Sequence, residues 1–214
     1  MLKIAHRGYS SKYGDNNITS FQQAIYNRFD MIELDIQMCK DGEIIVYHDP
    51  VIENKWINNT TLKELKELGV ITLRDFFCEI SPDVIKIFLD IKNNDGICEP
   101  LLQMINQMFT ESQQSNIYIS SFYRDVIIHL NDIREKNNFK LGFTTSNRLT
   151  IDELDYMMNG LQYICLDWTV LSEEQVDYLK SKGYTVFVFT CKNNTILEYI
   201  KRYNIDGIVS DILI

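Results

Sequence analysis

Residues 31–49 read MIELDIQMCKDGEIIVYHD, which is a β-rich run, a turn and a second apolar run. Successive side chains of a strand point to opposite faces, so Glu33 and Asp35 share one face and apolar residues occupy the other. In most strands such a pair of acids lies on a solvated face. Here the apolar neighbours indicate a buried strand, where two carboxylates repel each other unless a cation accompanies them. The segment therefore predicts a buried strand with a cation beside its acidic face.

The turn within this segment predicts a β-hairpin. Asp41-Gly42 lies between the two apolar runs, and this dipeptide favours a two-residue loop because both positions accept a positive φ. A two-residue loop would place His48 directly opposite Asp35, on the face that also carries Glu33. The hairpin would then gather two carboxylates and an imidazole at one place. That combination indicates a metal site with an acid/base group beside it.

The composition is that of an ordinary globular protein. The chain has 214 residues, of which 45% are hydrophobic and 24% are charged. Linkers, low-complexity runs and internal repeats are not apparent, so residues 1–214 are expected to form a single domain. A strand pattern begins at Leu2, which leaves no room for a signal peptide, and no apolar run reaches the length that a bilayer requires. A cytoplasmic protein without stable membrane insertion is therefore expected.

Charge and cysteine usage narrow the partners. The five cysteines are odd in number and lack CxxC spacing, which favours free thiols in a reducing compartment and argues against a zinc site. The formal net charge of −9 disfavours nucleic acid and anionic lipid headgroups as partners. A phosphate-bearing substrate would need local cations or a metal ion to hold it. The sequence leaves the oligomeric state open.

Strand and helix patterns alternate along the chain. Strands are expected at residues 2–5, 31–38, 84–91, 117–120, 140–144, 163–166, 184–190 and 207–210, and helices at 18–28, 62–68, 97–109, 123–136, 151–158, 172–181 and 195–203. Eight such strands predict an α/β protein with a (β/α)8 TIM barrel, although about 250 residues is typical and this chain is lean. An open doubly wound sheet is the alternative, and it usually has fewer strands. The hairpin forms an excursion after the second strand, and the eighth helix is expected to be missing or vestigial.

In such a barrel the chemistry lies at the carboxyl ends of the strands, where this sequence places its unusual residues. The expected rim carries two histidines, two cations and three carboxylates: His6, His48, Arg7, Lys92, Glu33, Asp35 and Asp90. Ligands that are all oxygen favour a hard cation, Mg²⁺ or Ca²⁺, over zinc. Three acids on one rim also repel one another, so Asp35→Asn is expected to stabilise the metal-free protein in part.

The order of short motifs along the chain resembles the glycerophosphodiester phosphodiesterase family. The matching motifs are His6-Arg7-Gly8, Gly14-Asp15-Asn16, Glu33-Leu34-Asp35, Lys40-Asp41-Gly42, His48-Asp49, Asp90-Ile91-Lys92, Ser121-Phe122 and Asp206-Gly207-Ile208-Val209-Ser210-Asp211. They span nearly the whole chain, and the ordered set is more specific than any one tripeptide. At Asp90-x-Lys92 the chain is also distantly similar to the venom-type phospholipases D.

The resemblance implies a TIM barrel that hydrolyses small-molecule glycerophosphodiesters to sn-glycerol 3-phosphate and an alcohol. It implies a divalent metal held by Glu33, Asp35 and Asp90. It also implies that His6 and His48 act as general acid and base, in an order that the sequence leaves open.

The chemistry of a phosphodiester fits the two cations of the rim. Arg7 and Lys92 are expected to bind the phosphate and to neutralise the charge that grows in the transition state. One imidazole would deprotonate the nucleophile, and the other would protonate the leaving alkoxide. The nucleophile is either the glycerol 2-hydroxyl, which gives a cyclic phosphate, or water.

The chain departs from the family's pattern at three places. Asp15 and Asp90 stand where the family usually has glutamates, so each carboxylate is one methylene shorter. Phe189 stands where the family commonly has a tryptophan that lines the pocket. Asp90 is still expected to ligate the metal, and Asp15 and Phe189 are expected to support the site.

Two other functions compete with this reading. The first is a lysophospholipase D-like phosphodiesterase, which would need an apolar ledge near the mouth of the pocket. The second is a non-catalytic phosphodiester-binding relative, which the shortened acids suggest. The headgroup that a catalytic protein would accept is left open.

Overall fold

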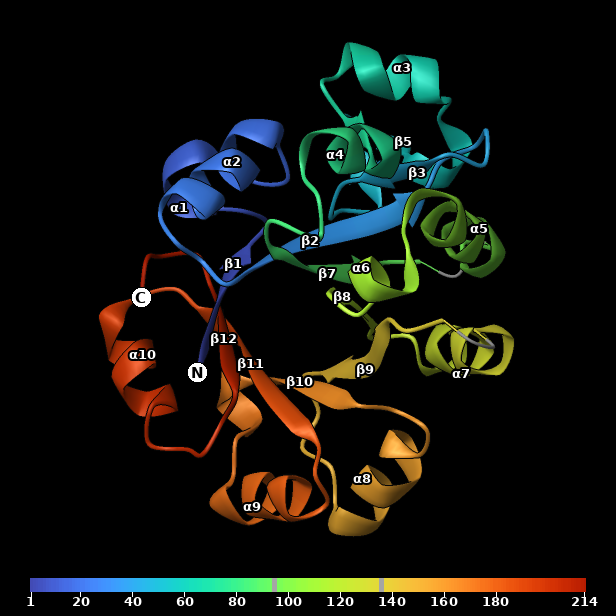
Figure 1. Ribbon diagram of the computed structural model, residues 1–214. Coiled ribbons are helices and arrows are strands. Elements are labelled where there is room, and N and C mark those ends of the chain that lie inside the picture. The colour runs from blue at the N-terminus through green and yellow to red at the C-terminus, as the bar shows by residue number, and fades with distance from the viewer. Residues whose placement is uncertain (94–95, 135–136) are drawn as a thin grey trace.

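A closed ring of parallel strands forms the centre of the computed structural model, which describes residues 1–93, 96–134 and 137–214 (Figure 1). The ring runs in the order β1-β12-β11-β10-β9-β8-β7-β2, and pairing of β1 with β2 closes it. Its strands are β1 (Leu2–His6), β2 (Met31–Met38), β7 (Lys86–Ile91), β8 (Ile117–Ser121), β9 (Lys140–Thr145), β10 (Tyr163–Asp167), β11 (Thr185–Cys191) and β12 (Gly207–Ser210). The (β/α)8 barrel is therefore confirmed, and the open doubly wound sheet is excluded.

Helices cover the outside of the barrel (Figure 1). The longer ones are α2 (Ile18–Tyr26), α5 (Cys98–Met108), α7 (Arg124–Ile133), α8 (Ile151–Met158), α9 (Glu173–Ser181) and α10 (Asn194–Ile200), and the short ones are α1 (Ser10–Tyr13), α6 (Glu111–Gln114) and the 3-10 turn η2 (Trp168–Val170). The helix expected at 123–136 reaches residues 135–136, which lie outside the described residues. Residues 211–214 form no helix, as expected for a vestigial eighth helix. Among the described residues, no helix is long and apolar enough to cross a membrane.

The alternation of side chains along each strand sorts them between two layers. Ile32 and Leu34 of β2 point outward into the main core between strands and helices, whereas Met31 points into the barrel. An apolar cluster inside the barrel joins Met31 to Ile4, Phe88, Tyr163 and Phe187. Because residues two apart share a face, the next inward positions toward the carboxyl ends of β1, β2 and β7 are polar ones. These positions are His6, Glu33 and Asp90.

The excursion after β2 is larger than a hairpin. β3 (Ile44–Val46) pairs with β2, β6 (Ile71–Thr72) pairs with β3, and β4 (Val51–Ile52) forms a separate hairpin with β5 (Lys55–Trp56). A 3-10 turn η1 (Ile57–Asn59), α3 (Leu62–Glu67) and α4 (Leu73–Glu79) complete it. The capping box of Thr61 and Glu64 that begins α3 is present. The sequence indicated α3 but neither α4 nor the second hairpin.

The register of the first hairpin differs from the prediction by one residue. Ile36 pairs with Val46, which leaves three residues in the loop, and the last of them is Gly42 with φ 78°. Asp-Gly fits this longer loop as well as the two-residue one, because a glycine in the left-handed region also closes a three-residue turn. β3 ends before His48. His48 is therefore not the cross-strand neighbour of Asp35.

Gly142 of β9 leaves room for an aromatic ring inside the barrel, and this generates a stability prediction. A Cβ atom at Gly142 would lie 2.5 Å from the ring of Tyr163, which is fully buried. Gly142→Ala is therefore expected to lower the free energy of unfolding by about 1–3 kcal/mol, measured by urea denaturation. In a Tyr163→Leu background the same change should cost less, because the smaller side chain makes room. An equal cost in both backgrounds would show that the ring contact is not the cause.

Candidate active site

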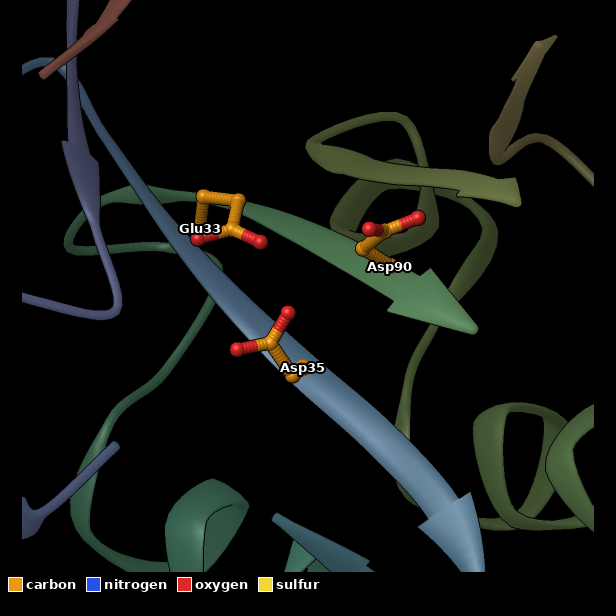
Figure 2. A group of neighbouring side chains, drawn as sticks. All are labelled: Glu33, Asp35 and Asp90. Carbon is orange, nitrogen blue, oxygen red and sulfur yellow. The ribbon is translucent and has the colours of Figure 1, made fainter. Parts of the chain in front are cut away.

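Three buried carboxylates meet at the carboxyl ends of two neighbouring strands. Glu33 and Asp35 lie on β2 and Asp90 lies on β7, and their side chains point toward one another (Figure 2). The strand register places Asp35 beside Asp90. Each of the three residues is at most 5% exposed, and one oxygen from each lies within 4.8 Å of those of the others. We call Glu33, Asp35 and Asp90 the acidic cluster.

Two cations lie against the acidic cluster. Lys92 Nζ lies 2.5 Å from Asp90 Oδ2 and 2.9 Å from Asp35 Oδ1. Arg7 Nε lies 3.0 Å from Asp35 Oδ2, and the Arg7 backbone N–H donates to Glu33 Oε2 at 2.9 Å. Asp35 thus lies between both cations.

The turn that positions Arg7 explains the His6-Arg7-Gly8 motif. Arg7 has φ 56° and Gly8 has φ 81°, so two consecutive residues adopt the left-handed region. A Cβ atom at Gly8 would lie 2.4 Å from Ser20 Oγ, so only glycine fits against α2 at this point. The tight turn sends the chain back across the rim. It aims the Arg7 backbone N–H at Glu33 and the guanidinium at Asp35.

The surroundings of the three acids shift their pKa values in different directions. Burial raises the pKa of Glu33 to about 7, and the negative charge of Asp35 adds to this shift. Burial also raises the pKa of Asp90, against the attraction of Lys92. For Asp35 burial acts in the same direction, but Lys92 and Arg7 outweigh it and lower its pKa. The lowered pKa of Asp35 argues against the expectation that Asp35→Asn would stabilise the metal-free protein, because that change would leave two cations without their shared partner.

His6 is held by a carboxylate from the far end of the sequence. His6 Nδ1 lies 2.5 Å from Asp211 Oδ1, just after β12. Burial of the imidazole would lower its pKa, but the hydrogen bond to Asp211 and the charge of Glu33 outweigh burial and raise it. Because Asp211 engages Nδ1, Nε2 is the ring nitrogen left for chemistry. The sequence placed Asp211 at the end of the last family motif but gave no reason to pair it with His6.

His48 reaches the same pocket as His6 by a different route from the predicted one. It lies beyond the end of β3, with Nδ1 2.6 Å from Asp49 Oδ1. It lines the pocket together with His6, Arg7 and Lys92. The predicted neighbourhood of His48 is thus present, although the predicted cross-strand pair is not.

Asp15 and Asn16 of the Gly14-Asp15-Asn16 motif have different roles. Asp15 is 54% exposed and accepts a 2.8 Å hydrogen bond from Arg7 Nη1, so it supports the guanidinium from outside the acidic cluster. Asn16 Nδ2 donates to Asp35 Oδ2 at 2.8 Å. Asn16 was not predicted to reach the acidic cluster. The sequence did contain a signal, because Asn16 stands in the quoted motif Gly14-Asp15-Asn16. Asparagine also tolerates the left-handed region, and Asn16 adopts a φ of 53° there.

Aromatic side chains form one wall of the pocket. Phe189 lines it as expected, and its ring packs edge-on against Phe122 with centroids 5.7 Å apart. Lys92 Nζ lies 5.6 Å from the centroid of Phe122. A third cation, Lys192, also lines the pocket, and sequence reasoning missed it because it lies beyond the end of β11. The arrangement offers carboxylate oxygens, two imidazoles and three cations around one pocket, which suits an anionic substrate.

Comparisons with known proteins agree on one family. Residues 6–213 match the sequence model of the glycerophosphoryl diester phosphodiesterase family. A glycerophosphodiester phosphodiesterase of Caldanaerobacter subterraneus subsp. tengcongensis is 26% identical over 236 residues, which cover 98% of this chain and 93% of that protein. The match to the family model includes the first motif, at His6, and the last one, which ends at Asp211.

Solved structures share the barrel. The crystal structure of a glycerophosphodiester phosphodiesterase from Thermotoga maritima has a TM-score of 0.83 at 26% identity and covers 100% of this chain and 95% of that one. A phosphodiesterase of Oleispira antarctica, solved in complex with the product sn-glycerol-3-phosphate, has a TM-score of 0.84 at 19% identity and covers 99% and 93%. This second likeness is one of fold. With the family match over residues 6–213, the chain belongs to the glycerophosphoryl diester phosphodiesterase family, whose members are phosphoric diester hydrolases.

Proposed function

We propose that residues 1–214 form one catalytic domain that hydrolyses glycerophosphodiesters to sn-glycerol 3-phosphate and an alcohol, with a divalent metal, Mg²⁺ or Ca²⁺. The proposal rests on one observation above all, which is the buried acidic cluster beside two histidines and two cations in one pocket. Family membership supports the substrate class. The Oleispira relative with bound sn-glycerol-3-phosphate supports the glycerol phosphate half of the substrate.

The acidic cluster fits a hard cation. Its donor atoms are all carboxylate oxygens, and Asp90 Oδ1 is buried and accepts no hydrogen bond from the described residues. Three carboxylates also carry more negative charge than Arg7 and Lys92 neutralise, which agrees with the pKa of about 7 at Glu33. Glu33, Asp35 and Asp90 would hold the ion. When bound, the ion would supply Lewis-acid stabilisation of the phosphoryl oxygens.

The protein's own cations have a separate task. Arg7 and Lys92 are positioned by Asp15, Asp35 and Asp90, and both line the pocket. They bind the non-bridging oxygens of the phosphate and stabilise the charge that develops during the reaction. Because their side chains are already held by carboxylates, little reorganisation is needed when the substrate arrives.

The histidines move the protons. His6 and His48 line one pocket, and each has a carboxylate on Nδ1, so each presents Nε2 to the substrate. One imidazole takes the proton of the attacking hydroxyl, and the other gives a proton to the leaving oxygen. Because the hydrogen bond to Asp211 and the charge of Glu33 raise the pKa of His6, we assign His6 as the general acid and His48 as the base.

The expected setting follows from composition. All five cysteines are free in the structure, which supports a reducing, cytoplasmic compartment. The net charge of −9 supports a small-molecule substrate over nucleic acid.

The purified protein tests the function directly. With Mg²⁺ or Ca²⁺ it should release glycerol phosphate from glycerophosphocholine. Release from lysophosphatidylcholine alone would favour the lysophospholipase D-like alternative. Release from neither, with metal bound, would favour a non-catalytic phosphodiester-binding protein.

The two-histidine mechanism predicts a bell-shaped dependence of kcat/KM on pH. His6→Ala and His48→Ala should each lose about 10²–10⁴-fold in turnover, because each removes one proton transfer. His129→Ala is the matched control, since His129 is on the outer helix α7 and pairs with Glu99. Near-normal turnover in either pocket variant would remove that histidine from the mechanism.

The dependence of kcat/KM on pH in Asp211→Asn shows which histidine gives rise to each limb of the bell-shaped profile. Loss of the carboxylate should lower the pKa of His6, because Asp211 raises it. If His6 is the acid, the alkaline limb should move to lower pH while the acidic limb stays. Movement of the acidic limb instead would make His6 the base.

Asp90 is predicted to be a metal ligand although it is shorter than the family's glutamate. Its carboxylate already lies within the 4.8 Å cluster, so the strand register brings it near enough. Asp90→Glu should keep metal affinity and activity within roughly tenfold, about 1.4 kcal/mol, and Asp90→Ala should lose both. Isothermal titration with metal gives the affinity. Wild-type affinity in Asp90→Ala would leave only two carboxylate ligands.

The raised pKa of Glu33 predicts how the free energy of unfolding of the metal-free protein depends on pH. Its pKa rises from 4.5 to about 7 on folding, so the folded protein holds the proton more tightly than the unfolded chain. That contribution is complete below pH 4.5 and is lost as the pH rises through about 7. The free energy of unfolding of Glu33→Gln, relative to that of the wild type, should therefore rise by on the order of 2 kcal/mol from pH 5 to pH 8. Urea unfolding in the presence of a chelator measures it. The exposed control Glu174→Gln should show no such gain, and a pH-independent difference for Glu33→Gln would contradict the shift.

A further inference from the structure

A second groove opens beside the catalytic pocket. Lys92 lines both of them, so the groove begins where a phosphate held by Lys92 would end. The other side chains that form its walls are mainly aromatic or carry amides: Gln37, Trp56, Asn58, Asn93 and Tyr123. We call this the side groove. It lies where the leaving alcohol of a bound phosphodiester could extend.

The backbone that presents Trp56 is held firmly while its indole stays exposed. Trp56 pairs with Val51 in the β4–β5 hairpin, and its carbonyl accepts a 2.7 Å hydrogen bond from Thr60 Oγ1. The loop of this hairpin, Glu53 and Asn54, has two positive φ angles of 45° and 63°. The side chain of Trp56 nevertheless remains in solvent, since the residue is 58% exposed. Packing of the core does not explain an indole held in this way, and a ligand that stacks on it would.

Two amides of the side groove, those of Asn58 and Asn93, offer hydrogen bonds to neutral hydroxyl groups, whereas the amide of Gln37 fixes the wall. Gln37 is 1% exposed, and its Nε2 donates to the carbonyls of Tyr47 and Asp49 at 2.9 Å each, which fixes this wall. Asn58 is exposed on η1. Asn93 Oδ1 is shielded from water and accepts no hydrogen bond within residues 1–93, 96–134 and 137–214. Neutral donors and acceptors of this kind pair with alcohols without a charge partner.

The same walls argue against other leaving groups. In the described part of the chain no carboxylate lines the side groove, so a quaternary ammonium would find no anionic partner there. An acyl chain would cover the amides of Asn58 and Asn93 without giving them hydrogen bonds, which is costly. Aromatic faces beside amides suit a ligand with C–H faces and hydroxyl edges.

We propose that the side groove binds a neutral polyhydroxylated leaving alcohol, such as inositol, a sugar or glycerol. The preferred substrates are then glycerophosphodiesters of polyols, with the ring or chain of the polyol against Trp56 and Tyr123 and its hydroxyls on the amides. This specificity rests on the proposed phosphodiesterase function and adds the class of the alcohol to it.

Steady-state kinetics with Mg²⁺ or Ca²⁺ test the proposal on three substrates: glycerophosphoinositol, glycerophosphocholine and lysophosphatidylcholine. The wild type should show at least a tenfold higher kcat/KM for the inositol diester than for the choline diester. Trp56→Ala and Asn58→Ala should each lower kcat/KM for the inositol diester by about tenfold, mainly through KM, and change the choline value less than twofold. Trp56→Tyr should keep most of the preference, because it keeps an aromatic face.

Two matched controls share the chemistry of the variants but not their position. Asn59→Ala changes the neighbouring exposed asparagine of η1, which does not line the side groove. Tyr156→Ala removes an aromatic side chain that is 72% exposed on α8. Both should leave the ratio of the inositol and choline values unchanged.

Tryptophan fluorescence gives a readout that does not need turnover. The chain has two tryptophans, so Trp168→Phe leaves Trp56 as the single reporter. In the double variant with His6→Ala, which blocks hydrolysis, glycerophosphoinositol should change the emission in a saturable way, and glycerophosphocholine should change it much less.

The outcomes separate the two proposals. Hydrolysis with a preference for the choline diester or the lysophospholipid, or equal losses on both diesters in the Trp56 and Asn58 variants, would overturn the polyol assignment and leave the phosphodiesterase function intact. Hydrolysis of none of the three substrates would overturn the proposed function, and the polyol assignment with it.

Discussion

The register between β2 and β7 is the constraint on which the site depends. It places Asp35 beside Asp90 and turns Glu33 to the same interior. A slip of one residue would move these acids to the helix side and bring Ile32 and Leu34 inward. The burial of those aliphatic residues in the main core therefore fixes the position of the acidic cluster. Hydrophobic packing outside the barrel and the chemistry inside it are two consequences of one alternation.

The sequence predicted the barrel because its evidence was periodic and repeated eight times along the chain. It also placed Glu33, Asp35 and Asp90 together, since strand alternation and the rim rule are local. The hairpin register failed because Asp-Gly fits loops of two and three residues alike, so the local signal left both open. The pairing of His6 with Asp211 joins the two ends of the chain. Only closure of β1 against β12 creates that contact, and no local pattern contains it.

The site also shows why charge counting at a rim is not sufficient. From the sequence the three acids look equivalent, and neutralising any one of them looks favourable. In the structure Arg7 and Lys92 both contact Asp35, whereas the one hydrogen bond that Glu33 accepts from the described residues comes from the backbone N–H of Arg7. The unmet negative charge is therefore concentrated on Glu33, whose pKa is about 7. Which acid keeps an unneutralised charge depends on which carboxylates the side chains of Arg7 and Lys92 contact. The tertiary fold determines those contacts.

Lys92 lies between the acidic cluster and the side groove. Its ammonium contacts two acids of the cluster, and its side chain also lines the side groove. In the proposed binding mode, the leaving oxygen of a phosphate on Lys92 would face Trp56 and Asn58. Trp56 and Asn58 of the side groove belong to the excursion after β2, which lies outside the eight-stranded ring, whereas Gln37 is on β2 itself. Changes at Trp56 or Asn58 would therefore alter the proposed alcohol site while the strand register preserves the acids, because these two residues and the acidic cluster are supported by different elements of the fold.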